Sequence, residues 1–293
     1  MKIIKNILGA FVLLAAFSCQ KHVVEYDTTP IGSLAEFQLH YFVPVVAVDS
    51  NNIYKMEVNG FEYSNGTMSA AGVYNPSVLL STYNAIPSGA TARFYTATPG
   101  DNNIKLYASN KYKPVYNQSA QLKTGKQNVF VYDFNKPPMV FDNGFPYPKI
   151  TTEKTGQSAW VKFYNFLYET ATTPTTLKLQ YQYQYTKDIV TKEKSDWIDV
   201  GKPVSFGEST GWEHITVIKE VEISQGSARI DYRIRMIGAD GSDQGSLKVN
   251  NASNAFVDYS DFWTATIGRC YHHVLSGLRT TAPRSAVRQF VAL

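Results

Sequence analysis

The fold is decided by residues 229–236, which read RIDYRIRM and alternate charged with apolar side chains without a break. Successive side chains of a β-strand point to opposite faces of the sheet, so this alternation predicts a half-buried strand. The face that starts at Ile230 is expected in a core, and the face that starts at Arg229 in solvent. A solvated surface is the simpler interpretation of Arg229, Arg233 and Arg235, and a docking surface for an acidic partner is the alternative.

A second alternating run, residues 180–185, reads QYQYQY and predicts three tyrosines on one face of a strand and three glutamines on the other. One interpretation is an aromatic platform that stacks on sugar rings, with a tryptophan nearby. The other is that the tyrosines fill a core, which Leu177 and Leu179 favour because they continue the tyrosine face. The candidate ligand-binding residues are therefore Tyr181, Tyr183, Tyr185, Trp197 and Trp212.

The composition of the whole chain fits strands. Of 293 residues, 44% are hydrophobic, 14% aromatic and 18% charged, which excludes a disordered or fibrous chain. Asn59-Gly60 and Asp240-Gly241 are typical of tight hairpin turns, and no helical period persists. The formal charge of +4 is too close to neutral to predict a nucleic-acid partner.

Three landmarks recur in order and indicate a duplication. Residues 35–39 resemble residues 159–163, and further along Gly100 corresponds to Gly226 and Gly125 to Gly268. Prolines and a glycine interrupt the chain at 143–149. We therefore predict an all-β protein with two tandem antiparallel β-sandwich (Ig-like) domains, at 34–148 and 149–293. The segment after Pro283 fits either a short helix or a closing strand.

The first copy resembles a bacterial extracytoplasmic family known as domain of unknown function 4397. The matching segments are Phe37 to Phe42, Tyr54 to Gly60, Pro99 to Tyr107 and Gly125 to Tyr132. The second copy departs from the pattern, because Gln225 replaces the proline before Gly226 and no Asn-Gly follows Leu177 to Tyr185. The resemblance implies a sandwich on a secreted or lipid-anchored protein, and it supplies no catalytic residues.

The N-terminus has the order of an export signal. Lys2 and Lys5 precede an apolar run over residues 7–17, which is too short to span a bilayer. Residues 15–19, AAFSC, resemble the relaxed lipobox of Bacteroidota lipoproteins. This resemblance implies that a signal peptide, 1–18, is removed, that Cys19 is acylated, and that 19–33 forms a lipid-anchored linker. The expected location is the outer membrane of a Gram-negative cell, on the cell surface or the periplasmic face.

The residue types needed for catalysis do not form a recognisable pattern. His272 and His273 are adjacent on an expected strand, so their rings should point to opposite faces and not share a metal. Cys270 is expected to be a small buried hydrophobe. We predict no catalytic residues, no metal and no cofactor. A hydrolase that uses His214 with a carboxylate such as Glu208 or Glu213 is the least favoured hypothesis.

The sequence thus predicts a non-catalytic lipid-anchored envelope protein that acts in binding or assembly at the outer membrane. The alternative is a glycan-binding accessory lipoprotein that uses an aromatic face of the second domain. Its partners would be the membrane, through the N-terminal lipid, and a polysaccharide or another envelope protein.

Overall fold

The computed structural model describes residues 31–63, 67–68, 74–75, 80–87, 94–108, 114–143, 158–188, 190–218, 222–224 and 226–292. The expected signal peptide 1–18, Cys19, most of the linker 19–33 and the seam between the copies lie outside these ranges. Within them, no helix is both long and apolar enough to cross a membrane. Besides strands, they contain two single-turn 3₁₀ helices, η1 (Ile31–Ser33) and η2 (Asp49–Asn51).

The N-terminal sandwich consists of two packed sheets. The first has the order β11-β10-β1-β6, with β7 also paired to β1; the second has the order β3-β2-β8-β9. The strands of the first sheet are β1 (Ala35–Tyr41), β6 (Asn84–Ile86), β7 (Tyr95–Ala97), β10 (Gly125–Val131) and β11 (Met139–Asp142). Those of the second are β2 (Lys55–Val58), β3 (Phe61–Tyr63), β8 (Gly100–Tyr107) and β9 (Tyr116–Leu122), and a separate ribbon pairs β4 (Thr67–Met68) with β5 (Tyr74–Asn75).

The C-terminal sandwich repeats this plan. Its first sheet has the order β13-β12-β23-β24 with β16 on β12, and its second has the order β15-β14-β18-β17 with β19 and β22 also on β18. The first contains β12 (Ser158–Thr170), β13 (Thr173–Pro174), β16 (Glu213–Thr216), β23 (Cys270–Leu278) and β24 (Ala286–Ala292). The second contains β14 (Lys178–Tyr185), β15 (Ile198–Asp199), β17 (Glu222–Ser224), β18 (Ser227–Ile237), β19 (Asp243–Ser246) and β22 (Ser260–Thr266). A small ribbon pairs β20 (Lys248–Asn250) with β21 (Phe256–Asp258).

The all-β fold class with tandem sandwiches is confirmed, and each sandwich adds a parallel pair among its antiparallel neighbours. β1 pairs with β10, and β12 pairs with β23, in parallel. The N–H of Gly125 donates to the carbonyl of Leu34 (3.0 Å), and the N–H of Gly268 donates to that of Ser158 (2.7 Å). The glycines matched in the sequence thus begin the corresponding parallel pair in each sandwich. Between the two members of each parallel pair, the chain passes through strands of the opposite sheet, which supplies the long connection that a parallel pair needs.

A separate hydrophobic core fills each sandwich. In the C-terminal one, the inward residues of β18 and β14 face each other, because Tyr181 lies opposite Ile234 and Tyr183 opposite Tyr232 in the antiparallel register. All four side chains belong to the core. The core of the N-terminal sandwich is built in the same way from residues such as Phe37, Ile104 and Val129.

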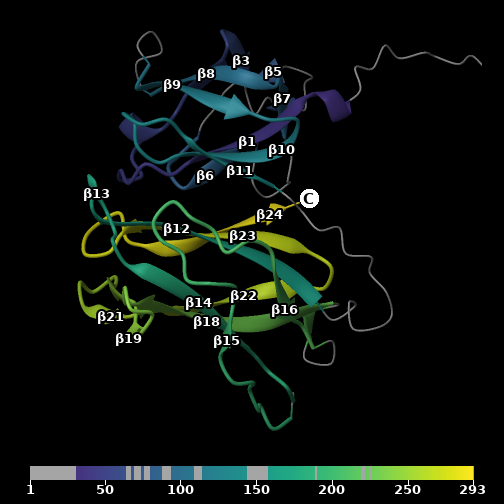
Figure 1. The fold of residues 1–293 in the computed structure, drawn as a ribbon, viewed down its shortest axis with the longest axis vertical. Coiled ribbons are helices and arrows are strands. Elements are labelled where there is room, and N and C mark those ends of the chain that lie inside the picture. Colours follow the sequence, from purple (N-terminus) through teal and green to yellow (C-terminus); the bar gives the residue numbers. More distant parts are fainter. Residues whose placement is uncertain are drawn as a thin grey trace, which may run out of the picture. The chain divides into compact units, whose positions relative to one another are not determined.

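A third apolar cluster joins the two sandwiches, and Leu34–Leu293 forms one compact unit. The sheet that contains β1 and β10 lies against the sheet that contains β12 and β23 (Figure 1), and Phe130 stacks on Phe166 with ring centroids 4.9 Å apart. Because its sheet has a partner on both faces, β23 is buried at every position. The buried members of the cluster are Phe42, Tyr83, Ala85, Phe130, Tyr132, Tyr164, Phe166, Tyr168, Val274, Leu278 and Phe290.

Buried polar side chains bond to one another across this contact. The Nε2 of His40 lies 3.1 Å from the Oδ1 of Asn128, and the Nδ2 of Asn128 donates to the Oδ1 of Asn143 at 3.0 Å. His272 reaches the same Asn143 oxygen through Nε2 (3.1 Å), and its Nδ1 lies 2.9 Å from the Tyr164 hydroxyl. The network is consistent with neutral imidazoles in both histidines.

The C-terminal segment is a strand, which settles the choice between helix and strand. β24 pairs with β23 from Ala286 opposite Ser276 to Ala292 opposite Cys270. Its Phe290 side chain enters the cluster between the sandwiches. Cys270 is a buried free cysteine, as expected from its apolar neighbours.

Candidate functional site

The tyrosine face of β14 points into the core, which corrects the aromatic-platform interpretation. Tyr181 is fully buried, and its hydroxyl lies 3.0 Å from the Nδ1 of His273. Tyr183 is also buried, and Tyr185 is half-buried. The rings pack against the opposite sheet and against Tyr232, so Tyr181 and Tyr183 offer no surface to a ligand.

The opposite face of the same strands forms a groove of about 420 Å³. Gln184 of β14, Asp231 of β18 and Phe262 of β22 lie side by side in register across three adjacent strands. Trp197, just before the edge strand β15, lines the same groove. We call this the outer-face groove, lined by Gln184, Lys194, Trp197, Arg229, Asp231, Tyr232, Ser260, Asp261 and Phe262.

Asp231 is the electrostatic centre of the groove. Its Oδ2 pairs with Lys194, and its Oδ1 accepts a hydrogen bond from the Nε of Arg229 at 2.8 Å. Partial burial raises the pKa of Asp231, but the hydrogen bonds from Lys194 and Arg229 outweigh it and hold the pKa below its usual value. Asp231 therefore stays ionised at neutral pH and fixes both cations at the groove floor.

Two of the aromatic residues that line the groove, Phe262 and Trp197, each stack against an arginine. The guanidinium carbon of Arg229 lies 3.8 Å from the ring centroid of Phe262, which is 50% exposed. The guanidinium of Arg233 lies 4.3 Å from the centroid of the Trp197 ring. Stacked guanidinium groups lose little freedom when they bind a ligand, because the ring already holds them in place.

Arg233 differs in its bonding partners from Arg229 and Arg235, the other arginines on the same face of β18. Arg235 pairs with Asp243 at 2.7 Å and Arg229 with Asp231, whereas Arg233 donates through Nε to the amide oxygen of Gln182 at 2.8 Å. Among the described residues it forms no ion pair. Partial burial and the neighbouring Arg235 charge lower its pKa, which still leaves the guanidinium protonated.

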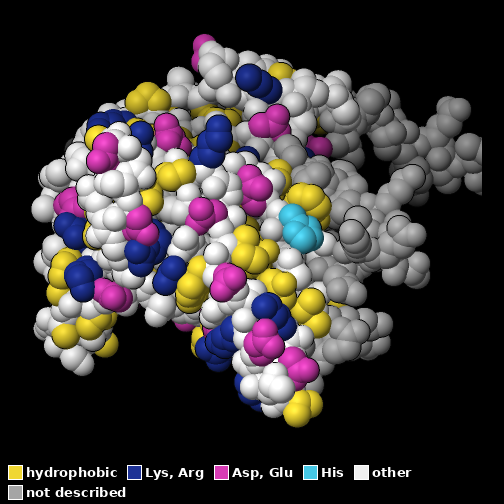
Figure 2. Space-filling model, turned by 60° about the horizontal axis from the view of Figure 1, so that its bottom comes forward, with side chains coloured by type: hydrophobic (Ala, Val, Ile, Leu, Met, Phe, Trp, Pro, Cys, Tyr) yellow, Lys and Arg dark blue, Asp and Glu magenta, His cyan; other side chains and the backbone are white. Residues whose placement is uncertain are grey.

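Figure 2 brings this end of the molecule forward and displays basic, acidic and apolar side chains interspersed on one surface. Aromatic rings together with a few placed polar groups can fix the orientation of a bound small molecule. The sequence named Trp197, which lines this groove, and left two interpretations of the β14 tyrosines open, of which the structure shows the core one for Tyr181 and Tyr183. It missed Lys194 and Phe262, although the single apolar side chain in the outward row Ser260, Phe262 and Thr264 was a usable signal.

Trp212, the remaining predicted ligand-binding residue, does not line the outer-face groove. Its Nε1 donates to the carbonyl oxygen of Asn143 at 2.6 Å, and its ring centroid is 4.9 Å from that of His272. It therefore links the two sandwiches. Cys19, the predicted lipidation site, lies outside the described residues.

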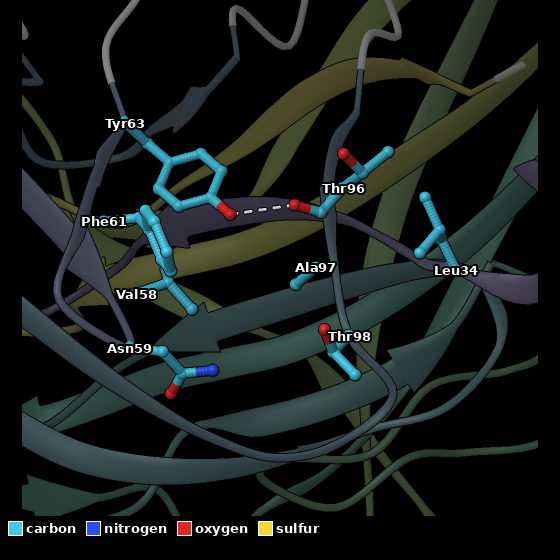
Figure 3. Close-up of a pocket in the computed structure, with 8 residues that line it drawn as sticks. All are labelled: Leu34, Val58, Asn59, Phe61, Tyr63, Thr96, Ala97 and Thr98. Carbon is cyan, nitrogen blue, oxygen red and sulfur yellow. Dashed lines mark hydrogen bonds between the residues drawn. The ribbon is translucent and has the colours of Figure 1, made fainter. Parts of the chain in front are cut away.

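A second cavity, of about 260 Å³, opens between the edges of the two sheets in the N-terminal sandwich. Figure 3 shows Val58, Phe61 and Tyr63 on one side and Thr96, Ala97 and Thr98 on the other, with the Tyr63 hydroxyl bonded to the Thr96 carbonyl at 2.8 Å. The described lining contains no charged side chain. This cavity therefore offers less specific chemistry than the outer-face groove.

The residues of the hydrolase hypothesis lie in the C-terminal sandwich. Glu208 and Glu213 do line one hollow, of about 530 Å³, and Glu208 accepts a hydrogen bond from the Ser205 N–H at 2.8 Å. The Nε2 of His214 lies 2.5 Å from the Oγ of Ser158, but Ser158 is buried. As expected from the sequence, His272 and His273 point to opposite faces of β23, toward Tyr164 and Tyr181 respectively.

Comparisons with known proteins give no functional identity. No family model matches the chain, and no curated protein matches it. Among solved structures, it aligns with a leucine-rich repeat protein from Bacteroides thetaiotaomicron at 7% identity and a TM-score of 0.22, over 84% of this chain and 26% of that one. A DUF3823 family protein from Bacteroides ovatus aligns at 10% identity and a TM-score of 0.21, over 80% of this chain and 99% of that one. The Bacillus anthracis TIE protein aligns at 8% identity and a TM-score of 0.21, over 83% and 34%.

Proposed function

We propose that this chain is a non-catalytic, lipid-anchored envelope protein that binds a polysaccharide through the outer-face groove of its C-terminal sandwich. The observation that carries the proposal is the row of Gln184, Asp231 and Phe262 across adjacent strands, with Trp197 at the sheet edge. A side-chain amide both donates hydrogen bonds to sugar hydroxyls and accepts them, an ionised carboxylate accepts them, and aromatic rings pack against the sugar's apolar faces.

The dimensions of the row support a chain-like ligand. Neighbouring strands lie about 4.8 Å apart, so the stretch from Gln184 to Phe262 extends for roughly 10 Å across the sheet. A ligand of two or three sugar units fits this length. The charge state of Asp231 supports binding over acid catalysis, because a carboxylate held ionised by two cations is a poor proton donor at neutral pH.

The test is affinity electrophoresis of the folded protein in gels that contain single purified polysaccharides. Phe262→Ala and Asp231→Asn should each remove retardation by the polysaccharide that retards the wild type. Phe256→Ala is the matched control, because Phe256 is also exposed and also lies under an arginine, Arg279, but outside the groove. The proposal would be contradicted if the polysaccharide still retarded both groove variants, or if no polysaccharide retarded the wild-type protein.

The anchoring part of the proposal has its own experiment. Cells grown with a labelled fatty acid should incorporate it into the wild-type protein, which should fractionate with the outer membrane. Cys19→Ala should abolish the label and release the protein from the membrane fraction. Labelling of the Cys19→Ala variant, or an intact Met1 in the mature wild-type protein, would contradict lipidation at this position.

A further inference from the structure

We infer that the ligand of the outer-face groove is an acidic saccharide, whose carboxylate or sulfate group binds Arg233 where Trp197 holds it. This inference rests on the proposed function and names the class of glycan that the groove takes. It is carried by the lack of an ion pair at Arg233 among the described residues, by the stacking of Arg233, and by its place in the sheet register.

Arg233 differs in its partners from three neighbouring cations of the face. Lys194 and Arg229 share Asp231, and Arg235 is held by Asp243 and by the Ser246 hydroxyl. Arg233, in contrast, forms no ion pair within the described part of the chain. The groove's own lining is balanced, with Lys194 and Arg229 against Asp231 and Asp261. Arg233 adds a positive charge beside this lining, and Asp199 and Asp243 oppose that charge without forming an ion pair with it.

The groups that hold the Arg233 side chain in place do not use the two terminal nitrogens of its guanidinium. Its Nε donates to the Oε1 of Gln182, and the Nε2 of Gln182 donates in turn to the Oδ1 of Asp199 at 2.7 Å. Its guanidinium lies over Trp197. Within the described residues, its two terminal nitrogens make no hydrogen bond. A planar fork held in this way matches the two oxygens of a carboxylate or sulfate.

Register places this fork beside the row that would hold the sugar. Arg233 is paired with Ser260 of β22, which lines the groove, and it follows Asp231 by two positions on the same face of β18. Residues two apart on a strand lie about 7 Å from each other. An acidic group on one sugar unit can therefore reach Arg233 while the neighbouring unit lies over Asp231 and Phe262.

The experiment compares polygalacturonate with the same polymer after methyl esterification, by isothermal titration calorimetry with the wild-type protein. Esterification removes the negative charge and keeps the sugar backbone, so it should weaken binding about ten- to a hundredfold. Raising the salt concentration should weaken binding of the acidic polymer only. Because this arm uses the unmodified protein, it does not depend on the folding of a variant.

Substitutions then locate the charge. Arg233→Gln should weaken binding of polygalacturonate about ten- to a hundredfold, and Trp197→Ala should weaken it less, because the arginine remains but loses its support. Arg235→Gln is the matched control: it removes one positive charge from the same face of β18 but leaves Arg233 in place.

The outcomes separate the two proposals. Equal binding of the acidic and esterified polymers would overturn the acidic-saccharide inference and leave polysaccharide binding intact. Equal losses in the Arg233→Gln and Arg235→Gln variants would overturn the role of Arg233. Equal binding of polyglutamate or DNA would contradict a saccharide ligand, and binding of no saccharide at all would contradict the proposed function as well.

Discussion

Phe130 of β10 stacks on Phe166 of β12 with their ring planes 20° apart, so the two sandwiches meet through an aromatic contact at the centre of their interface. His40 also stacks on Phe130, at a centroid distance of 4.3 Å. The interface thus consists of rings packed as in a protein core.

This contact predicts that the two sandwiches unfold together. Phe166→Ala should cost about 3–5 kcal/mol of unfolding free energy, and a double-mutant cycle with Phe130→Ala should give a coupling of about 0.5–1.5 kcal/mol. Urea denaturation followed by both tryptophan fluorescence and far-ultraviolet circular dichroism measures this. Two separate transitions in the wild type would contradict it.

The buried histidines predict a loss of stability in mild acid. Burial lowers the pKa of His40 to about 4 and that of His273 to about 3, and it lowers the pKa of His272 as well. Below pH 6.5 these histidines become protonated in the unfolded chain but stay neutral in the folded one. The free energy of unfolding that is present above pH 6.5 is therefore lost as the pH falls. Each histidine contributes up to about 1.4 kcal/mol per pH unit until its folded pKa is reached.

Urea denaturation between pH 7.5 and pH 5 isolates this effect, because most carboxylates titrate below that range. His40→Gln should reduce the slope of unfolding free energy against pH. A wild-type free energy of unfolding that stays constant from pH 7.5 to pH 5 would show that these histidines are not buried as neutral groups.

The hydroxyl of Tyr181 predicts a stability effect without a binding effect. Tyr181→Phe leaves the buried Nδ1 of His273 without its partner and should cost about 1–3 kcal/mol. Tyr185→Phe is the control, since the Tyr185 hydroxyl makes no hydrogen bond among the described residues. Thermal unfolding measures the cost. Loss of polysaccharide binding by a folded Tyr181→Phe protein would instead restore the tyrosine face as a binding surface.

The closing strand predicts that the C-terminus is needed for folding. Removal of residues 282–293 deletes β24 and with it the Phe290 side chain from the cluster between the sandwiches. The truncated protein should lose more stability than Phe290→Ala, which alone should cost about 3–5 kcal/mol. Val190→Ala is a control because Val190 is 84% exposed. Equal melting temperatures for the truncated protein and the full chain would contradict this role.

The sequence was a good guide wherever alternation decided the answer. Ile230, Tyr232 and Ile234 share the buried face because charged neighbours on both sides leave no other arrangement. The same parity placed Tyr181 inward beside Leu179. The turn glycines located equivalent strand starts, because a positive backbone φ, 93° at Gly125 and 76° at Gly268, suits glycine.

Contacts between distant segments could not be predicted in this way. The stacking of Phe130 on Phe166 depends on how two complete sheets pack, which local periodicity does not specify. β23 reads CYHHVLSGL, without an Asp, Glu, Lys or Arg and without apolar–polar alternation, which was a usable sign that both faces of that strand are covered. The outer-face groove is assembled from β14, β18, β22 and a loop, so only the strand register brings Trp197, Asp231 and Phe262 together.

Binding of an acidic saccharide in the outer-face groove is tested most directly by the amide and indole N–H spectrum of ¹⁵N-labelled protein during titration with oligogalacturonate. The chain has four tryptophans, so the indole signals can be assigned by substitution. The Trp197 signal should move in proportion to saturation, while the signals of Trp160 and Trp263, whose indole nitrogens are buried, should stay in place. An unchanged Trp197 signal at saturating ligand, or shifts confined to residues of the N-terminal sandwich, would contradict the claim.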